Sequence, residues 1–183
     1  MFSAVLNQPS LRETRVRPAL ILTTLSLALM STGASSQESA SIVGIGDYFK
    51  ALNSRAELRF GDGIAVSGNL MPVSSTAEDG ASTGIDGDPT VQTKEDSGAV
   101  HVFVREPGGW TQQAYLKPSN SDVQDNFGAA VAIDGDLLVI GAPNEDSNAT
   151  GVNGDPFSHL SNQSGAAYVH RIEGSTVVQE AYL

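Results

Sequence analysis

Two acidic segments carry the residues best suited to bind a metal ion. Carboxylate and amide side chains recur in both segments: Glu78, Asp79, Asp86 and Asp88 in the first, and Glu145, Asp146, Asn153 and Asp155 in the second. Calcium takes about six to eight oxygen ligands, so convergence of either set would create a calcium site. The same residue types also build turns in which Asp and Asn side chains bond their own backbone. The sequence leaves both interpretations open.

Other catalytic or metal-binding patterns are weak. The three histidines, His101, His159 and His170, show no metal-ligand spacing. The absence of cysteine excludes thiolate sites and disulfides. The chain has 10 Lys and Arg against 21 Asp and Glu, a formal net charge of -11. Binding to nucleic acid or to an anionic membrane needs clustered basic residues, so we expect neutral or cationic partners instead.

Residues 1–36 have the layout of an export signal. Arg12, Arg15 and Arg17 precede an apolar run over residues 19–30, and small residues follow over 31–36. The run is shorter than the roughly 20 residues of a membrane-spanning helix, which favours a cleaved signal over an uncleaved anchor or a buried helix. We therefore expect a secreted, periplasmic or cell-surface protein with no stable membrane span after cleavage. Residues 37–47 would form a linker.

An internal repeat organises the rest of the chain. Phe60-Gly61 recurs as Phe127-Gly128, and 127 − 60 gives a period of 67 residues. The same period relates Glu78-Asp79 to Glu145-Asp146, and it holds without an insertion up to Ala181-Tyr182-Leu183. A period of this size is typical of repeat architectures. The repeats run over 48–114 and 115–183, the second including the first residues of a third copy.

Each repeat is predicted to form four strands. In the second repeat, apolar or alternating segments cover 127–133, 137–142, 165–172 and 176–183, and no helical period competes. Asp134-Gly135 is a favoured hairpin turn. The first two segments are apolar on both faces and the fourth is the most polar, so burial should fall from the first strand to the fourth, as in a propeller blade. An all-β partial β-propeller of two four-stranded antiparallel blades, preceded by a signal-peptide helix, is predicted. The alternative is an array of two small all-β domains.

The segments at Phe127-Gly128 and Gly141-Ala142-Pro143 resemble the FG-GAP repeat, the blade of integrin-α-like propellers, in the form common in exported bacterial proteins. The resemblance covers residues 48–183. It implies a seven-bladed propeller and ligand binding through loops. It also implies a calcium loop between the first and second strands, but Asp134-Gly135-Asp136 is too short to wrap a calcium ion.

The first repeat departs from this pattern. Ser74-Ser75-Thr76 replaces Gly-Ala-Pro, and Pro72 falls in the middle of the expected second strand. Because proline cannot donate a ladder hydrogen bond, we expect a distorted first blade whose second strand shortens to about Leu70 and Met71.

These observations favour a non-enzymatic exported binding or adhesion module that presents acidic loops to a protein or glycan partner. One alternative is a structural repeat protein stiffened by calcium as its cofactor. A second is a fragment of an exported propeller enzyme, which is disfavoured because Asp62 is the only ionisable residue on the two first strands. A propeller needs about four to eight blades. We therefore expect further propeller repeats as partners, either in a longer gene product or by self-association of copies.

Overall fold

A computed structural model describes Tyr48 and residues 50–183. The predicted export signal and the linker lie outside the described residues. Among the residues that are described, no helix is long and apolar enough to cross a membrane. The described elements are the strands β1 (Phe60–Ile64), β2 (Leu70–Ser75), β3 (Ala99–Glu106), β4 (Gly109–Leu116), β5 (Ala130–Asp134), β6 (Leu137–Ala142), β7 (Ala166–Glu173) and β8 (Thr176–Tyr182).

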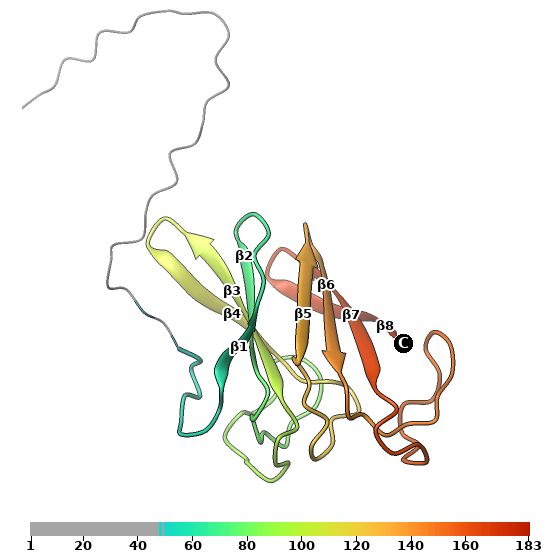
Figure 1. Cartoon of the computed structure of the whole chain (residues 1–183). Coiled ribbons are helices and arrows are strands. Elements are labelled where there is room, and N and C mark those ends of the chain that lie inside the picture. Colours follow the sequence, from blue (N-terminus) through green and yellow to red (C-terminus); the bar gives the residue numbers. More distant parts are fainter. Residues whose placement is uncertain (1–47, 49) are drawn as a thin grey trace, which may run out of the picture. The chain divides into compact units, whose positions relative to one another are not determined.

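The strands form two separate four-stranded sheets (Figure 1). The first sheet has the order β1-β2-β3-β4, and the second has the order β5-β6-β7-β8. Every neighbouring pair is antiparallel and consecutive in the chain. The prediction of two four-stranded antiparallel sheets, one for each repeat, is confirmed.

The predicted strand limits hold closely in the second repeat. β6 has the predicted bounds, and β7 and β8 each differ by one residue. β5 begins three residues later than expected, because Phe127 instead forms a parallel bridge with Gly98 of the first repeat. Gly128 follows with φ of 97°, a backbone conformation that favours glycine. The strand proper therefore starts only after the chain has crossed from one sheet to the other.

The predicted shortening of the second strand at Pro72 is wrong. β2 continues to Ser75, and Pro72 lies opposite Val102 of β3. The Pro72 carbonyl accepts a hydrogen bond from the Ala65 amide of the neighbouring segment (3.2 Å). Both backbone groups of a residue in an antiparallel strand point to the same neighbour, so the proline nitrogen faces β1 rather than β3. The β1–β2 ladder shifts register between Phe60 and Ile64, so the distortion lies in β1.

The predicted fall in burial from the first strand to the fourth is also wrong. Residues of β1 and β5 are exposed or only half-buried, whereas β2 and β3 contain the longest buried runs. β1 and β5 are edge strands that pair with one neighbour each. In a closed propeller, the first strand of each sheet is crowded near the axis by the other sheets. Two sheets alone do not surround β1 and β5 in this way.

The main apolar core lies between the two sheets. Val100, Val102 and Leu116 of the first sheet are fully buried in one cluster with Leu138 and Ile140 of the second. The sheets therefore pack face to face, each burying a surface that it could not bury alone. The two sheets do not join edge to edge into one continuous sheet. Packing of one face on another is expected of neighbouring repeat units.

Candidate functional site

The loops between the second and third strands gather at one end of the two sheets with the segments that enter each sheet (Figure 1). We define the first loop as residues 76–98 and the second loop as residues 143–165. The left-handed backbone positions recur with the repeat period. The angle φ is 66° at Glu57 and 65° at Gln124, 51° at Arg59 and 54° at Asn126, 53° at Asp86 and 56° at Asn153, and 51° at Asp96 and 55° at Gln163. The two repeats thus share one backbone, and side chains at matched positions can be compared directly.

Glu78 is the buried centre of the first loop. Its Oε2 accepts hydrogen bonds from Lys117 Nζ (2.9 Å), Tyr115 Oη (2.9 Å) and the Gly80 amide (2.9 Å). Its Oε1 accepts one from Asn53 Nδ2 (3.2 Å). The carboxylate therefore ties together the loop, the end of β4 and the segment that precedes β1.

Glu145 takes the same place in the second loop. Its Oε1 accepts a hydrogen bond from Asn120 Nδ2 (2.7 Å), the counterpart of Asn53. Its Oε2 accepts bonds from the amide and the hydroxyl of Ser147 (3.1 Å each), and this hydroxyl contacts Tyr182 Oη. The asparagine and loop-amide donors of the first network recur, but Tyr182 contacts the Ser147 hydroxyl where Tyr115 bonds Glu78 directly.

The remaining acidic and amide candidates bond the backbone of their surroundings. Asp79 and Asp146 accept hydrogen bonds from the backbone amides of Asp96 and Gln163, respectively (2.9 and 2.7 Å). Asp86 and Asn153 accept them from the amides of Tyr115 and Tyr182 (2.8 and 2.9 Å). Asp88 and Asp155 accept them from the amides of Thr90 and Phe157 (2.8 and 3.0 Å). Only the Asp88 and Asp155 bonds, which reach two residues along the chain, are contacts of the turn interpretation. The other four bonds join segments 17 or 29 residues apart.

The structure does not gather the calcium candidates into one ligand set. Within the part of the chain that is described, no group of three or more His, Asp or Glu side chains is placed to hold a metal ion. The calcium hypothesis stays a prediction, which calorimetric titration of the protein with calcium would test.

Burial and pairing set the charge of the Glu78 network. Burial alone would raise the pKa of Glu78, but Lys117 and the hydrogen bonds to the carboxylate outweigh it and lower that pKa. Burial lowers the pKa of Lys117, which Glu78 partly offsets. Among the described residues no cation forms an ion pair with Glu145 or Asp125, and burial raises the pKa of Asp125 to about 6, helped by the nearby charges of Asp122 and Glu145.

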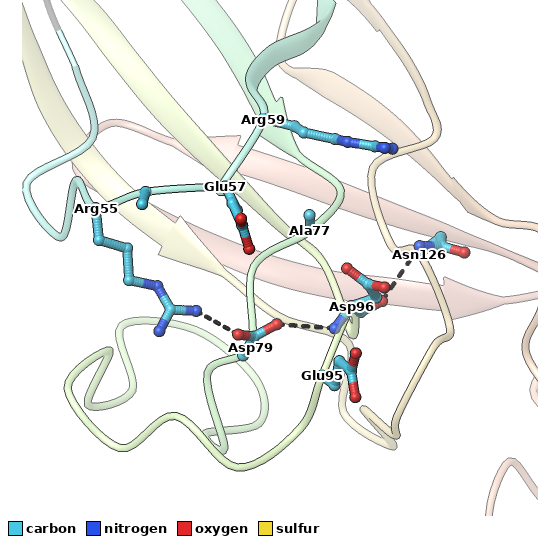
Figure 2. Close-up of a pocket in the computed structure, with 9 residues that line it drawn as sticks. Arg55, Glu57, Arg59, Ala77, Asp79, Glu95, Asp96 and Asn126 are labelled. Atoms are coloured by element: carbon cyan, nitrogen blue, oxygen red, sulfur yellow. Dashed lines mark hydrogen bonds and ion pairs between the residues drawn. The ribbon is translucent and has the colours of Figure 1, made fainter.

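A polar pocket of about 750 Å³ opens beside the first loop (Figure 2). Its charged lining residues are Arg55, Glu57, Arg59, Asp79, Glu95 and Asp96. Arg55 forms an ion pair with Asp79 (2.7 Å). In Figure 2 the Arg59 side chain extends across the pocket, and Glu57 points into the space between the two arginines. The volume falls within the range of small-ligand and side-chain pockets.

Four of the six charged positions are neutral in the second repeat, while the positions matched to Arg55 and Asp79 hold Asp122 and Asp146. Gln124, Asn126, Asn162 and Gln163 stand where the pocket has Glu57, Arg59, Glu95 and Asp96. The backbone angles agree within a few degrees at the three left-handed positions of this set. The pocket charges are therefore a property of the first repeat and are not required by the fold.

Sequence reasoning missed this pocket and the buried role of Lys117. The signal is present in the alignment of the two repeats. There, Glu57, Arg59, Glu95 and Asp96 align with residues that carry side-chain amides. What the sequence could not show is that segments about 40 residues apart, such as 55–59 and 95–96, line one opening.

The fold and its loops define an all-β repeat protein made of packed four-stranded sheets. Residues 110–170 match the family model described as FG-GAP repeat. FG-GAP repeats form propeller blades, so the chain contains an FG-GAP repeat and its two four-stranded antiparallel sheets have the form of such blades. A search of curated proteins found no match.

Proposed function

We propose that this protein is an exported, non-enzymatic binding module whose pocket beside the first loop binds a protein partner. The observation that carries the proposal is the presence of Glu57, Arg59 and Asp96 at left-handed backbone positions that hold Gln, Asn and Gln in the second repeat. Left-handed backbone is costly for most side chains, and Asn tolerates it best among residues other than glycine.

These charges do little for the fold itself. The side chains of Glu57, Arg59 and Glu95 form no hydrogen bond or ion pair with any other described residue. Residues that accept backbone strain without an internal partner are candidates for contact with a ligand. Exposed charges on loops held by a rigid scaffold are also the usual material of binding surfaces.

The charge balance favours a partner with cationic side chains. Once Arg55 and Asp79 are paired, the pocket retains three carboxylates, from Glu57, Glu95 and Asp96, against one guanidinium, from Arg59. The whole chain is also acidic, with a net charge of -11. Such a field speeds the approach of a basic partner, and Arg59 restricts which basic segments fit.

The absence of enzymatic activity is part of the proposal. The pocket lining contains no histidine, serine or threonine. The segment Gly80-Ala81-Ser82-Thr83-Gly84 has the spacing of a serine nucleophile motif, but it lies inside the first loop. That motif needs a sharp turn from a strand into a helix, which this loop does not provide. Export is supported by the composition of residues 1–36.

The test replaces the pocket charges with the residues of the second repeat. The variant E57Q/R59N/E95N/D96Q keeps side chains that the same backbone already accepts. On an array of basic, acidic and neutral peptides, the original protein should bind basic peptides, with affinity that falls as salt rises. The variant should lose at least about tenfold in affinity, as expected when charged contacts are removed.

Controls separate binding from folding. The exposed Glu173→Gln substitution removes a charge far from the pocket and should leave peptide binding unchanged. The melting temperature of the pocket variant should equal or exceed that of the original protein. Equal binding by the original protein and the pocket variant would refute the pocket as the binding site. Binding confined to a glycan array would assign the partner to the other macromolecular class.

A further inference from the structure

Three side chains with complementary reactivity meet at the carboxylate of Glu78. Lys117 Nζ donates to Glu78 Oε2 (2.9 Å), and Asn53 Nδ2 donates to Glu78 Oε1 (3.2 Å). The two oxygens belong to one carboxylate, so Glu78 holds the lysine amine and the asparagine amide on adjacent atoms. A neutral amine is a nucleophile, the carbonyl carbon of an amide is an electrophile, and a carboxylate can carry a proton between them.

The amine lies where its charge is least stable. Neither Lys117 nor Glu78 exposes any side-chain surface. Burial lowers the pKa of Lys117, and desolvation is one way in which a lysine becomes nucleophilic. Burial acts to raise the pKa of Glu78, but Lys117 and the hydrogen bonds outweigh it, so the ion pair is the resting form. Transfer of one proton from Nζ to Oε2 along their hydrogen bond converts this pair into a neutral amine and a neutral acid.

The amide of Asn53 is held less firmly than its counterpart in the second repeat. Asn120 has both ends bonded, since its Nδ2 donates to Glu145 Oε1 (2.7 Å) and its Oδ1 accepts from Tyr168 Oη (2.7 Å). The first repeat has His101 at the position of Tyr168, and Asn53 Oδ1 is buried without a hydrogen-bond partner within the described structure. A buried carbonyl that lacks a donor costs free energy. The Asn53 amide is therefore the less stable reactant of the two.

The surrounding hydrogen bonds fix the amine and the carboxylate. Ser97 Oγ accepts from Lys117 Nζ (2.7 Å) and donates to the backbone carbonyl of Glu78 (3.0 Å). Tyr115 Oη and the Gly80 amide each donate to Glu78 Oε2 (2.9 Å). Groups held in this way react as if at very high concentration, because the entropy of bringing them together is lost when the chain folds.

We propose that Lys117 and Asn53 become joined by an intramolecular isopeptide bond, with Glu78 as the acid and base of the reaction. Glu78 Oε2 takes a proton from Nζ, the neutral amine attacks Cγ of Asn53, and Oε1 gives a proton to Nδ2 as this nitrogen leaves. The Nζ–Cγ bond forms and the Cγ–Nδ2 bond breaks. The surplus proton on Nζ passes to the ammonia, so the products are a secondary amide and an ammonium ion, and Glu78 ends as a carboxylate. The reaction consumes no other reactant.

The bond would tie together the two ends of the first sheet. It connects the segment before β1 to the segment after β4, across 117 − 53 = 64 positions of the chain. A cross-link over a long stretch restricts the unfolded chain and so favours the folded one. The linked protein should therefore melt at a higher temperature than an unlinked variant.

Mass spectrometry of the purified full chain tests this inference. The intact mass should be lower than the sequence requires by one molecule of ammonia. Proteolysis should release a branched peptide that contains both Asn53 and Lys117. Lys117→Arg and Glu78→Gln should each abolish this peptide, since the first lacks the nucleophile and the second cannot exchange protons. Lys50→Arg removes an exposed lysine near Asn53 in sequence and should leave the linked peptide unchanged.

The mass of the original protein decides the result even where a variant fails to fold. An original protein that is folded by circular dichroism and keeps its full mass after several days at neutral pH would overturn the proposal. So would conversion of Asn53 to aspartate without a link, because water would then be the nucleophile. A linked peptide that forms equally fast in folded E78Q would remove Glu78 from the reaction and overturn the proposed mechanism. Neither linked residue lines the pocket beside the first loop, so this result is independent of peptide binding there.

Discussion

Lys117 and Glu78 form a fully buried ion pair, with Nζ 2.9 Å from Oε2 and no exposed side-chain surface on either residue. The lysine comes from the segment after β4 and the carboxylate from the loop after β2. Ser97 Oγ accepts a second hydrogen bond from the lysine. The pair therefore joins two parts of the first blade where an unpaired charge would be costly.

Replacing Lys117 by Met should strongly destabilise the protein. The substitution leaves the Glu78 carboxylate buried without its cation, which typically costs about 3–5 kcal/mol in the free energy of unfolding. Denaturant unfolding measures this. The double variant K117M/E78Q should lose less than K117M alone. Lys50 occupies the position in the first repeat that matches Lys117, and it is exposed. Lys50→Met should therefore change the free energy of unfolding by less than about 0.5 kcal/mol. Equal effects of K117M and K50M would contradict the burial argument.

Gly98 and Gly165 provide a matched pair for the contact between the blades. Their φ angles are 80° and 78°, so alanine is similarly strained at both. A Cβ at Gly98 would lie 2.2 Å from the Phe127 carbonyl oxygen, whereas one at Gly165 would lie 3.2 Å from the Pro143 carbonyl oxygen. G165A should cost about 1 kcal/mol in stability. G98A should cost at least about 2 kcal/mol more in thermal or denaturant unfolding, because backbone must move. Similar losses would show that the bridge between Gly98 and Phe127 is not rigid.

His101→Tyr should stabilise the first blade. His101 is fully buried, and neither ring nitrogen has a hydrogen-bond partner within the described structure. Asn53 Oδ1 is also buried and unsatisfied. At the matched positions, Tyr168 Oη donates to Asn120 Oδ1 (2.7 Å). A tyrosine at 101 should reproduce this bond and raise the free energy of unfolding by about 1 kcal/mol. A lower melting temperature than that of the original protein would mean that the blade lacks room for the larger ring.

Stability should fall as the pH is lowered from 7 to 5. Burial lowers the pKa of His101 and His170 to about 4, so both stay neutral in the folded protein while the unfolded chain binds protons below about pH 6.5. The stability that the two neutral histidines contribute to the folded protein is complete above about pH 6.5 and declines as the pH falls toward about 4. Asp125, with a pKa raised to about 6, acts in the opposite direction because its folded form binds a proton first.

Each histidine should account for about 2 kcal/mol between pH 7 and pH 5, and Asp125 should offset about 1 kcal/mol. Denaturant unfolding at the two pH values measures the net loss. His170→Phe installs the residue found at the matched Phe103 and should remove about half of the histidine effect. An unchanged pH dependence in H170F would mean that His170 does not set it.

The repeat, the division into two sheets and three of the four strands of the second blade were predictable. A continuous apolar run and the Asp134-Gly135 turn define β6, while Gly165 and Gly174 bracket β7, so local pattern and topology agree there. Pro72 misled the prediction because the sequence does not show which neighbour a backbone nitrogen faces. The ladder irregularity lies instead between Phe60 and Ile64, the part of β1 that contains Gly61 and Gly63.

The candidate site was harder to predict. The acidic loop residues were identified, but the structure places most of them against backbone amides. The charges proposed to contact a partner come from Glu57, Arg59 and Glu95, which no local motif connects. Their proximity depends on how the chain enters β1 relative to the first loop, which is a tertiary property.

Placing the core between blades also affects how the gene can change in length. Because the face of the first sheet that carries Val100 and Leu116 packs on the face of the second that carries Leu138 and Ile140, an added copy of the 67-residue unit would meet the same kind of surface at this boundary. Duplication of the coding segment would therefore need no compensating substitutions inside the unit.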